Sequence, residues 1–264
     1  MTTLHIVMPA YNEEEGIRSF IDEIRTHVAD LADGVRFFIV DDRSTDSTPA
    51  VLRAAAADHG DITAIRSEVN QGHGPTALAA YRAGLADRPD IIVHVDGDGQ
   101  FAGEDFRALL SALAEADVVH GVRRGRTDPW YRRTLTRSVQ FLVRATSGAQ
   151  VPDVNTPLRA YRPDALDALL AAVPADAMVP HVHFSLAEAR SGFRVRHVDV
   201  RSLPRRGTSA EGTMWGTTKT PRLPPRRLRS FARGALGEVW RVSLSPKAPL
   251  RRGVPLAQAE QPAR

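Results

Sequence analysis

The sequence predicts an α/β protein with a mainly parallel central sheet and helices on both faces of that sheet. Three observations lead to this fold class. Short apolar runs alternate with segments of helical spacing through the first 120 residues, as in a doubly wound sheet. The apolar runs are nearly continuous, which is typical of parallel strands buried on both faces. Hydrophobic residues make up 42% of the 264 residues, enough for one sizeable core.

The expected elements alternate regularly along the chain. We expect strands at residues 4–8, 35–40, 62–65, 91–95 and 117–119. Between them we expect helices at residues 14–31, 48–58, 75–86 and 104–115. The helix that starts at residue 48 is expected to have Thr48 as its N-cap and Pro49 in its first turn. Beyond residue 121 we expect an arginine-rich helix at 130–146, an extended stretch at 154–161, helices at 164–172 and 178–191, and a strand at 193–200.

Polar motifs follow the first four expected strands. In chain order they are Pro9-Ala-Tyr-Asn-Glu13, Asp41-Asp-Arg-Ser-Thr-Asp46, Asn70-Gln-Gly-His-Gly74 and Asp96-Gly-Asp-Gly-Gln100. Because open α/β sheets bind ligands at the carboxyl ends of their strands, we expect these motifs to meet at one edge. Together they supply an aromatic face, acceptors for a base and a ribose, a glycine loop for phosphate, and metal ligands. The sequence therefore predicts a site for a nucleoside diphosphate.

The last of these motifs is the candidate metal site. Two carboxylates and an amide, from Asp96, Asp98 and Gln100, are oxygen ligands that suit Mg²⁺ or Mn²⁺. Phosphatases of the haloacid dehalogenase type also carry two aspartates after a strand. In those proteins the motif normally ends the first strand and continues with Thr or Val, whereas here it ends the fourth strand and Gly99 follows. We therefore favour the metal-diphosphate interpretation.

These motifs, together with Asp153-Val-Asn-Thr-Pro-Leu-Arg-Ala-Tyr161, resemble family 2 glycosyltransferases with the GT-A fold. The similarity is to the branch of dolichol-phosphate mannosyltransferases and bacterial polyprenyl-phosphate glycosyltransferases, and it covers residues 4–205. It implies a metal-dependent, inverting transfer from a UDP- or GDP-sugar to a polyprenyl-phosphate lipid. Two alternatives stay open: a hydroxyl acceptor on a glycan or small molecule, and an inactive relative that binds nucleotides or docks on membranes.

The resemblance also implies roles for single residues. Those expected around the nucleotide are Pro9, Tyr11, Glu13, Asp42, Gly72 and Asp96. Asp42 is expected to accept a hydrogen bond from the base, and Asp41 is as well explained by a cap or turn role. The metal is expected on Asp96, Asp98 and Gln100, where it would act as a Lewis acid on the leaving diphosphate.

The expected catalytic residues are Arg123, Arg133 and Asp153. The arginines lie where the family carries phosphate-binding arginines, and Asp153 is a base, an acceptor-positioning carboxylate or a turn residue. A polyprenyl phosphate needs no base, because a phosphate monoester has a second pKa of about 6. His181 and His183 are two residues apart and do not face each other on a helix, so we interpret them as acceptor-side or structural.

The chain departs from the family pattern at three places. Arg43 stands where glycine is common, so the turn after Asp42 is expected to differ. Residues 101–103 replace the usual histidine- and proline-containing continuation of the metal motif. Residues 155–159 stand where mannosyl-type members often have a Gly-Phe-Arg run. These departures affect the lip of the metal site and the acceptor, and they leave the donor chemistry unchanged.

The C-terminal part is strongly basic. Residues 201–264 carry 14 Lys or Arg and 3 Asp or Glu, a net charge of +11, whereas the rest has a net charge of −7. Arg205 to Ser209 resembles the family's mobile acceptor loop. An apolar stripe from Leu228 to Trp240 predicts a basic amphipathic helix, which either lies on an anionic membrane or docks on the catalytic domain. We expect no nucleic-acid partner, because no platform of interleaved aromatic residues accompanies the arginines.

We expect three regions along the chain. Residues 1–205 form the catalytic domain, residues 206–245 the basic acceptor loop and helix, and residues 246–264 a disordered tail. The sequence has no cysteine, which fits a reducing compartment, and it shows neither a signal peptide nor a transmembrane run. We therefore expect a cytoplasmic protein, which is peripheral on the cytoplasmic face of the membrane if the basic helix binds lipid.

Overall fold

The computed structural model describes residues 1–125, 140–141, 143–146, 148, 151–207 and 226–254. Within these residues the strands are β1 (Thr3–Ala10), β2 (Gly34–Asp41), β3 (Ile62–Arg66), β4 (Ile91–His94), β5 (Val118–Arg124), β6 (Arg159–Tyr161) and β7 (Val195–Arg201). The helices are α1 (Ile17–Val28), α2 (Thr48–His59), α3 (His73–Leu85), α4 (Gly103–Leu113), α6 (Pro163–Ala172), α7 (Pro180–Glu188), α8 (Arg226–Val239) and the π-helical turn η1 (Trp240–Leu244).

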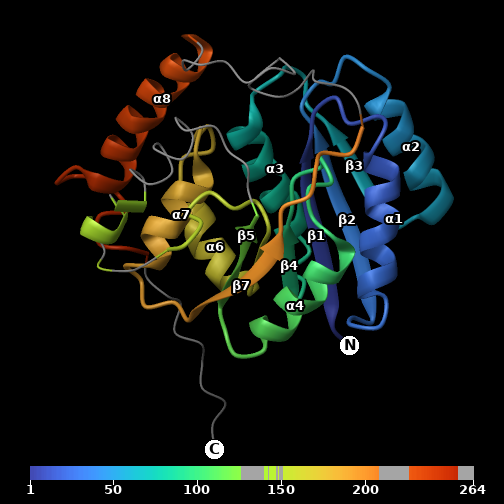
Figure 1. The fold of residues 1–264 in the computed structure, drawn as a ribbon, viewed down its shortest axis with the longest axis horizontal. Coiled ribbons are helices and arrows are strands. Elements are labelled where there is room, and N and C mark those ends of the chain that lie inside the picture. The colour runs from blue at the N-terminus through green and yellow to red at the C-terminus, as the bar shows by residue number, and fades with distance from the viewer. Residues whose placement is uncertain (126–139, 142, 147, 149–150, 208–225, 255–264) are drawn as a thin grey trace, which may run out of the picture.

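The strands form one sheet in the order β3-β2-β1-β4-β6-β5-β7 (Figure 1). The pairs β1–β2, β2–β3, β1–β4 and β5–β7 are parallel. β6 is antiparallel to both of its neighbours, with Arg159 opposite His94 on β4 and opposite His120 on β5. The prediction of a mainly parallel sheet is confirmed, and β6 is the strand that reverses direction.

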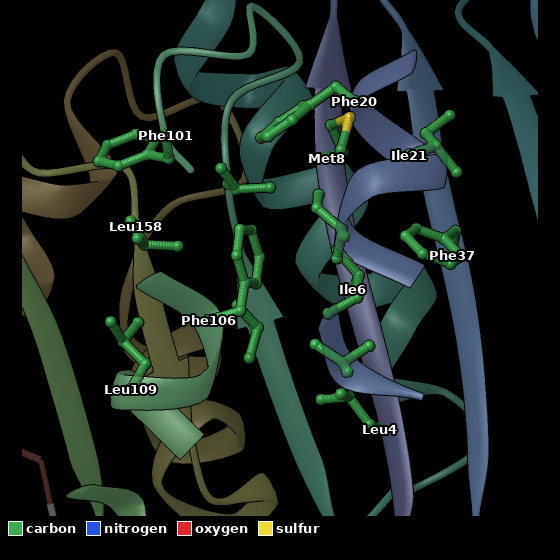
Figure 2. Packing of buried hydrophobic residues seen from close by; sticks show 14 of the residues in the cluster. Leu4, Ile6, Met8, Phe20, Ile21, Phe37, Phe101, Phe106, Leu109 and Leu158 are labelled. Atoms are coloured by element: carbon green, nitrogen blue, oxygen red, sulfur yellow. The ribbon is translucent and has the colours of Figure 1, made fainter. Parts of the chain in front are cut away.

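Helices cover both faces of this sheet, as predicted (Figure 1). Successive residues of a strand point to opposite faces, so Ile6 of β1 packs on one side and Val7 on the other. The face that holds Ile6 packs against α1, α2 and α4 in the larger core cluster, part of which is drawn in Figure 2. The opposite face packs against α3, α6 and α7. The two cores cover the faces of the sheet, and the polar motifs lie at the carboxyl ends of β1 to β4.

Two helix starts differ from the sequence-based expectation. α1 begins at Ile17 because the amides of Gly16 and Ile17 bond to the carbonyl of Glu13 and form a turn first. In α2 the N-cap is Ser47, whereas we expected Thr48. The Thr48 amide instead bonds to Asp46 Oδ1 at 2.9 Å, and its hydroxyl accepts a hydrogen bond from the Glu13 amide at 2.8 Å. These contacts tie the start of α2 to the end of β1.

The C-terminal segment packs on the domain up to residue 254. Leu250 is fully buried and Val254 is 5% exposed, and both belong to the core on the α3, α6 and α7 face. The expectation of disorder from residue 246 is therefore wrong for residues 246–254, and residues 255–264 lie outside the described part. In the described part of the chain, every helix is too short or too polar to cross a membrane.

Candidate functional site

The first two strands and the fourth bring their polar motifs together at one edge, as predicted. The amide of Gly97 donates to the carbonyl of Pro9 at 3.1 Å, and the amide of Asp42 donates to the carbonyl of Ala10 at 2.9 Å. These bonds continue the sheet beyond the paired residues of β1, β2 and β4. A Cβ on Gly97 would lie 3.0 Å from the Pro9 carbonyl oxygen, so the close approach of the two loops favours glycine there. The loop after β4 is thus held against the end of β1.

Asp96 and Asp98 form a pair of interacting carboxylates in this loop. Burial, and after it the charge of Asp96, raises the pKa of Asp98 to about 6. Oδ1 of Asp96 is buried and has no hydrogen-bond partner among the described residues. Nε2 of His73, at the start of α3, lies 3.6 Å from the same oxygen. The loop therefore carries negative charge that its protein surroundings, His73 and Arg205 among them, compensate only in part.

This donor set fits a divalent cation. An unpartnered buried carboxylate oxygen and a neighbouring carboxylate with a raised pKa are both stabilised by a metal ion. Within the described ranges, no cluster of three or more His, Cys, Asp or Glu side chains could hold a metal without help. Asp96, Asp98 and Gln100 would therefore hold the cation only together with oxygens of a ligand, as Mg²⁺ sites on phosphates do.

Asp42 anchors the loop that precedes α3. Its side chain is 4% exposed, and its two oxygens accept hydrogen bonds from the amides of Gln71 at 2.7 Å and Gly72 at 2.9 Å. Gly72 has a φ of +87°, a left-handed backbone that favours glycine. Each oxygen of a carboxylate can accept more than one hydrogen bond, so the expected bond from a nucleobase to Asp42 stays a prediction.

The neighbouring carboxylates have turn roles. Oδ1 of Asp41 accepts a hydrogen bond from the Ser44 amide at 3.0 Å, and Oδ2 lies 3.2 Å from Nε of Arg66. Asp46 accepts hydrogen bonds from the amides of Thr48 and Glu14. These contacts shape the loop between β2 and α2 and favour a structural interpretation for both aspartates.

Glu13 lies beside the loop that holds Asp96 and Asp98, called the carboxylate loop below, and is paired with Arg205. The two oxygens of Glu13 are 2.6 and 3.1 Å from Nη2 and Nε of Arg205, and Nη2 also donates to the carbonyl of Asn12. Burial raises the pKa of Glu13 to about 7, and the Arg205 pair opposes that rise. Pro9 is buried at the end of β1 and Tyr11 is half-buried just beyond it. Pro9, Tyr11 and Glu13 thus lie at the end of β1, and Arg205, which follows β7, contacts Glu13.

Residues 203–207 lie directly on the carboxylate loop. The amide of Arg206 donates to the carbonyl of Asp98 at 3.0 Å, and the amide of Leu203 donates to the carbonyl of Gln100 at 2.9 Å. The Arg206 guanidinium lies 4.9 Å above the ring of Phe20 and bonds to Glu23 of α1 at 2.5 Å. Sequence reasoning missed Phe20 and Glu23, because each is an ordinary residue of an amphipathic helix.

The predicted catalytic residues Arg123 and Asp153 form a bidentate ion pair. Nε and Nη2 of Arg123 donate to the two oxygens of Asp153 at 2.8 and 3.0 Å, and Nη2 also donates to the carbonyl of Asn155 at 3.1 Å. Both side chains are largely buried. Arg133, the third predicted catalytic residue, lies outside the described residues. The structure therefore brings two of the three together, as partners of each other.

A sequence model of glycosyl transferase family 2 matches residues 5–170, more than half of the chain. The chain belongs to this family. It is similar to two undecaprenyl-phosphate 4-deoxy-4-formamido-L-arabinose transferases. The one from Sodalis glossinidius is 30% identical over 194 residues, which are 73% of this chain and 59% of the relative. The one from Aeromonas hydrophila is 26% identical over 196 residues, 74% of this chain and 59% of the relative. The matched region thus spans less than two thirds of each relative.

Solved structures confirm the GT-A fold. Glucosyl-3-phosphoglycerate synthase from Mycobacterium tuberculosis, in complex with Mn²⁺, UDP and phosphoglyceric acid, matches with a TM-score of 0.61 at 20% identity. The match covers 90% of this chain and 78% of that protein. A complex of the same synthase with Mn²⁺ and UDP-glucose matches equally well.

Arg159, in the run that resembles the family's acceptor segment, is fully buried. Its guanidinium donates to the carbonyls of Thr156 and Val154 at 2.9 and 2.7 Å, and Nη1 lies 3.6 Å from Oε1 of Glu188. Nε2 of His120 lies 2.9 Å from the other Glu188 oxygen. Arg159 is thus the centre of a buried polar network in this family 2 chain, and its side chain is not exposed to solvent.

His181 and His183 have structural partners too. Nε2 of His181 lies 3.1 Å from the hydroxyl of Tyr81, and among the described residues neither histidine belongs to a group of three or more His, Cys, Asp or Glu that could hold a metal. Nε2 of His183 lies 2.9 Å from Oε1 of Glu238 on α8, and its Nδ1 lies 2.7 Å from the Ser243 hydroxyl. Glu238 also accepts hydrogen bonds from two amides at the start of α7. These contacts dock the end of α8 on the domain.

Proposed function

We propose that this chain transfers a sugar from a UDP- or GDP-sugar to a polyprenyl phosphate with the help of Mg²⁺ or Mn²⁺. The observation that carries the donor half is the only partly compensated Asp96–Asp98 pair at the carboxyl edge, beside Glu13 and the loop that Asp42 holds. The family to which the chain belongs consists of glycosyl transferases. The relatives named undecaprenyl-phosphate transferases support a lipid-phosphate acceptor.

The metal would stabilise the leaving group. Sugar transfer releases a nucleoside diphosphate, and a divalent cation offsets the negative charge that develops on its phosphate oxygens. Asp96, Asp98 and Gln100 would hold that cation together with the diphosphate. Arg205 lies against Glu13 at the same place, so its guanidinium is close enough to add a charge-assisted bond to a phosphate.

The Arg123–Asp153 pair favours a phosphate acceptor. Both oxygens of Asp153 are bonded to Arg123, so we propose that Asp153 positions this arginine and does not act as a base. Nη1 of Arg123 has no partner among the described residues and is the donor left for an acceptor phosphate. A phosphate monoester is already anionic at neutral pH and attacks without losing a proton, whereas a sugar hydroxyl needs a base.

We propose that the end of α8 faces an anionic membrane from the cytoplasmic side. Trp240 is 58% exposed and Leu236 is 55% exposed, one turn apart. Arg229 and Arg233 are exposed on the preceding turns of the same face. Apolar side chains next to arginines are the composition of a helix that binds at a lipid interface. α8 is docked through Glu238, so docking and membrane contact involve different sides of one helix.

Thermal stability with nucleotides tests the donor site. UDP or GDP should raise the melting temperature only when Mn²⁺ or Mg²⁺ is present, and Asp98→Asn should abolish this metal dependence. Asp87→Asn is the matched control, because that carboxylate pairs with Arg36 outside the site. Stabilisation by nucleotide without metal, or none at all, would contradict the assignment.

Transfer assays test the acceptor. With the nucleotide-sugar that stabilises the protein, sugar should appear on undecaprenyl phosphate and not on undecaprenol or free sugars. Transfer to a hydroxyl acceptor alone would replace the lipid-phosphate proposal with the alternative.

Vesicle sedimentation tests the proposed membrane surface of α8. Leu236→Ser/Trp240→Ser should reduce sedimentation with anionic vesicles. Val69→Ser, an exposed apolar residue elsewhere, should leave it unchanged. Equal sedimentation of both variants would argue against the α8 surface.

A further inference from the structure

A basic pocket opens beside the proposed donor site, next to the start of α2. Its volume is about 540 Å³, and three arginines line it, Arg43, Arg53 and Arg66. They come from the β2–α2 loop, from α2 and from the end of β3. None of the residues expected to bind the nucleotide or the metal lines this pocket. The proposed sugar transfer therefore gives none of the three arginines a role in catalysis or donor binding.

Arg43 has an unusual backbone for its residue type. Its φ is +63°, in the left-handed region that favours glycine, and it stands where glycine is common in the resembling family. Side chains other than glycine are strained in this region and persist where the surrounding structure or a function requires them. The Arg43 side chain is exposed and lines the pocket.

The positive charge of the pocket is only partly neutralised. Arg66 is paired with Asp41 and donates to the Ser44 carbonyl at 3.0 Å. Arg43 and Arg53 have no ion pair within 4.0 Å in the described part of the protein. Asp46 is the one acidic residue that lines the pocket, and its oxygens already accept hydrogen bonds from two amides. Two guanidinium groups are thus available to an anion.

The start of α2 contributes little to this site. The amide of Ser47 is bonded to Glu14 at 2.7 Å, and the amide of Thr48 is bonded to Asp46 at 2.9 Å. Pro49 has no amide hydrogen. Recognition in this pocket therefore depends on the arginine side chains and on the hydroxyl of Ser47, which is exposed at the pocket wall.

We propose that this pocket binds a phosphate group, either inorganic phosphate or the phosphate monoester of a larger ligand. Arginine side chains suit this group because their planar forks make paired, charge-assisted hydrogen bonds to phosphate oxygens. The pocket shares no lining residue with those proposed to hold the donor diphosphate and its metal. The proposal does not depend on the identity of the sugar or of the acceptor.

NMR titration with inorganic phosphate locates the site. In the metal-free, nucleotide-free protein, phosphate should shift the backbone amides of Ser44, Thr45 and Ser47, and it should leave those of Gly97 and Gly99 unchanged. Shifts confined to the two glycines would place the phosphate in the donor site and overturn the proposal, as would the absence of any saturable shift.

Substitutions separate specific binding from general charge. Arg43→Gly/Arg53→Ala removes both free guanidinium groups and keeps the fold, because glycine favours the φ of residue 43 and alanine favours the helix. This variant should bind phosphate at least about tenfold more weakly. Arg82→Ala/Arg252→Ala removes the same charge elsewhere and should bind like the unchanged protein. Equal weakening in both variants would overturn the proposal.

Vesicles distinguish the two sources of the phosphate group. If the natural ligand is a lipid headgroup, phosphatidic acid vesicles should bind the protein more weakly after Arg43→Gly/Arg53→Ala, and phosphatidylcholine vesicles should show no difference. If it is soluble, the double substitution changes phosphate binding and leaves vesicle binding unaltered. Either result supports the pocket and identifies the source of its phosphate group. If the double variant keeps both phosphate binding and vesicle binding, the proposal is wrong.

Discussion

Removing Arg159 tests the buried polar network between β6 and α7. The side chain is fully buried and lies 3.6 Å from Glu188, whose pKa is lowered mainly by His120 and by Arg159 against the opposing effect of burial. Arg159→Met keeps most of the aliphatic volume and removes the charge. It leaves an ionised Glu188 in the core and removes the donors to the carbonyls of Val154 and Thr156.

The expected cost is several kcal/mol. Breaking a buried ion pair by removing one partner destabilises a protein by about 3–5 kcal/mol, because the remaining charge is uncompensated. Each carbonyl left without a donor adds about 1 kcal/mol where water cannot replace it. Because the methionine side chain still fills the space, no cavity cost is added, and we expect a loss of about 5–7 kcal/mol in the free energy of unfolding at pH 7. Arg159→Met/Glu188→Gln removes both charges and should recover about 2 kcal/mol of this loss.

Urea denaturation of the three proteins measures these differences, and its pH dependence checks the sign. The folded-state pKa of Glu188 is lowered, so the pair stabilises the protein above the ordinary value of 4.5 and this contribution is lost as the pH falls below it. The gap between the unchanged protein and Arg159→Met should therefore narrow in acid. A loss under about 1 kcal/mol, or a double variant no more stable than the single one, would refute the reasoning.

Three further predictions concern the carboxylate loop, α8 and the core. Affinity for Mn²⁺ should rise about tenfold per pH unit up to about pH 6 and then level off, because a proton competes with the metal for Asp98; calorimetry at several pH values would show a flat profile if this is wrong. Glu238→Gln should cost about 1–3 kcal/mol and speed amide exchange in α8, and unchanged exchange would contradict the docking role. Gly84→Ala places a Cβ 2.2 Å from Cγ1 of Val7 and should cost about 1–3 kcal/mol in thermal unfolding. The control Gly237→Ala meets nothing within 4 Å and should not destabilise α8.

The donor edge was predictable because its signals are local. Each of the strands β1, β2 and β4 is a short apolar run that ends directly in polar residues, and parallel strands bring such ends together. The expected meeting of the motifs at Pro9, Asp42 and Gly97 is confirmed by the hydrogen bonds between them. What periodicity and motif order cannot indicate is where a carboxylate points, and Asp42 points at the backbone of the loop before α3.

The remaining contacts depend on residues that are far apart in the sequence. Arg206 and Glu23 are 183 residues apart, and neither has a neighbour that marks it as a partner. Arg123 and Asp153 were both expected at the site, but their pairing follows from how β5 and the segment before β6 meet. Leu250 was missed because isolated apolar residues in a stretch rich in proline and arginine give no periodic pattern.

The reversed direction of β6 brings a late segment of the chain to the edge where the early motifs lie. Because β6 is antiparallel to β4, the residues that precede it, among them Asp153, lie at the same edge as the residues that follow β1, β2 and β4. Apart from Arg205, the residues proposed for the donor come before residue 101, whereas Arg123 and Asp153, proposed for the acceptor, come after residue 120. On the proposed function, we therefore expect substitutions or insertions just before Arg159 to change the acceptor and to leave the residues proposed for nucleotide binding intact.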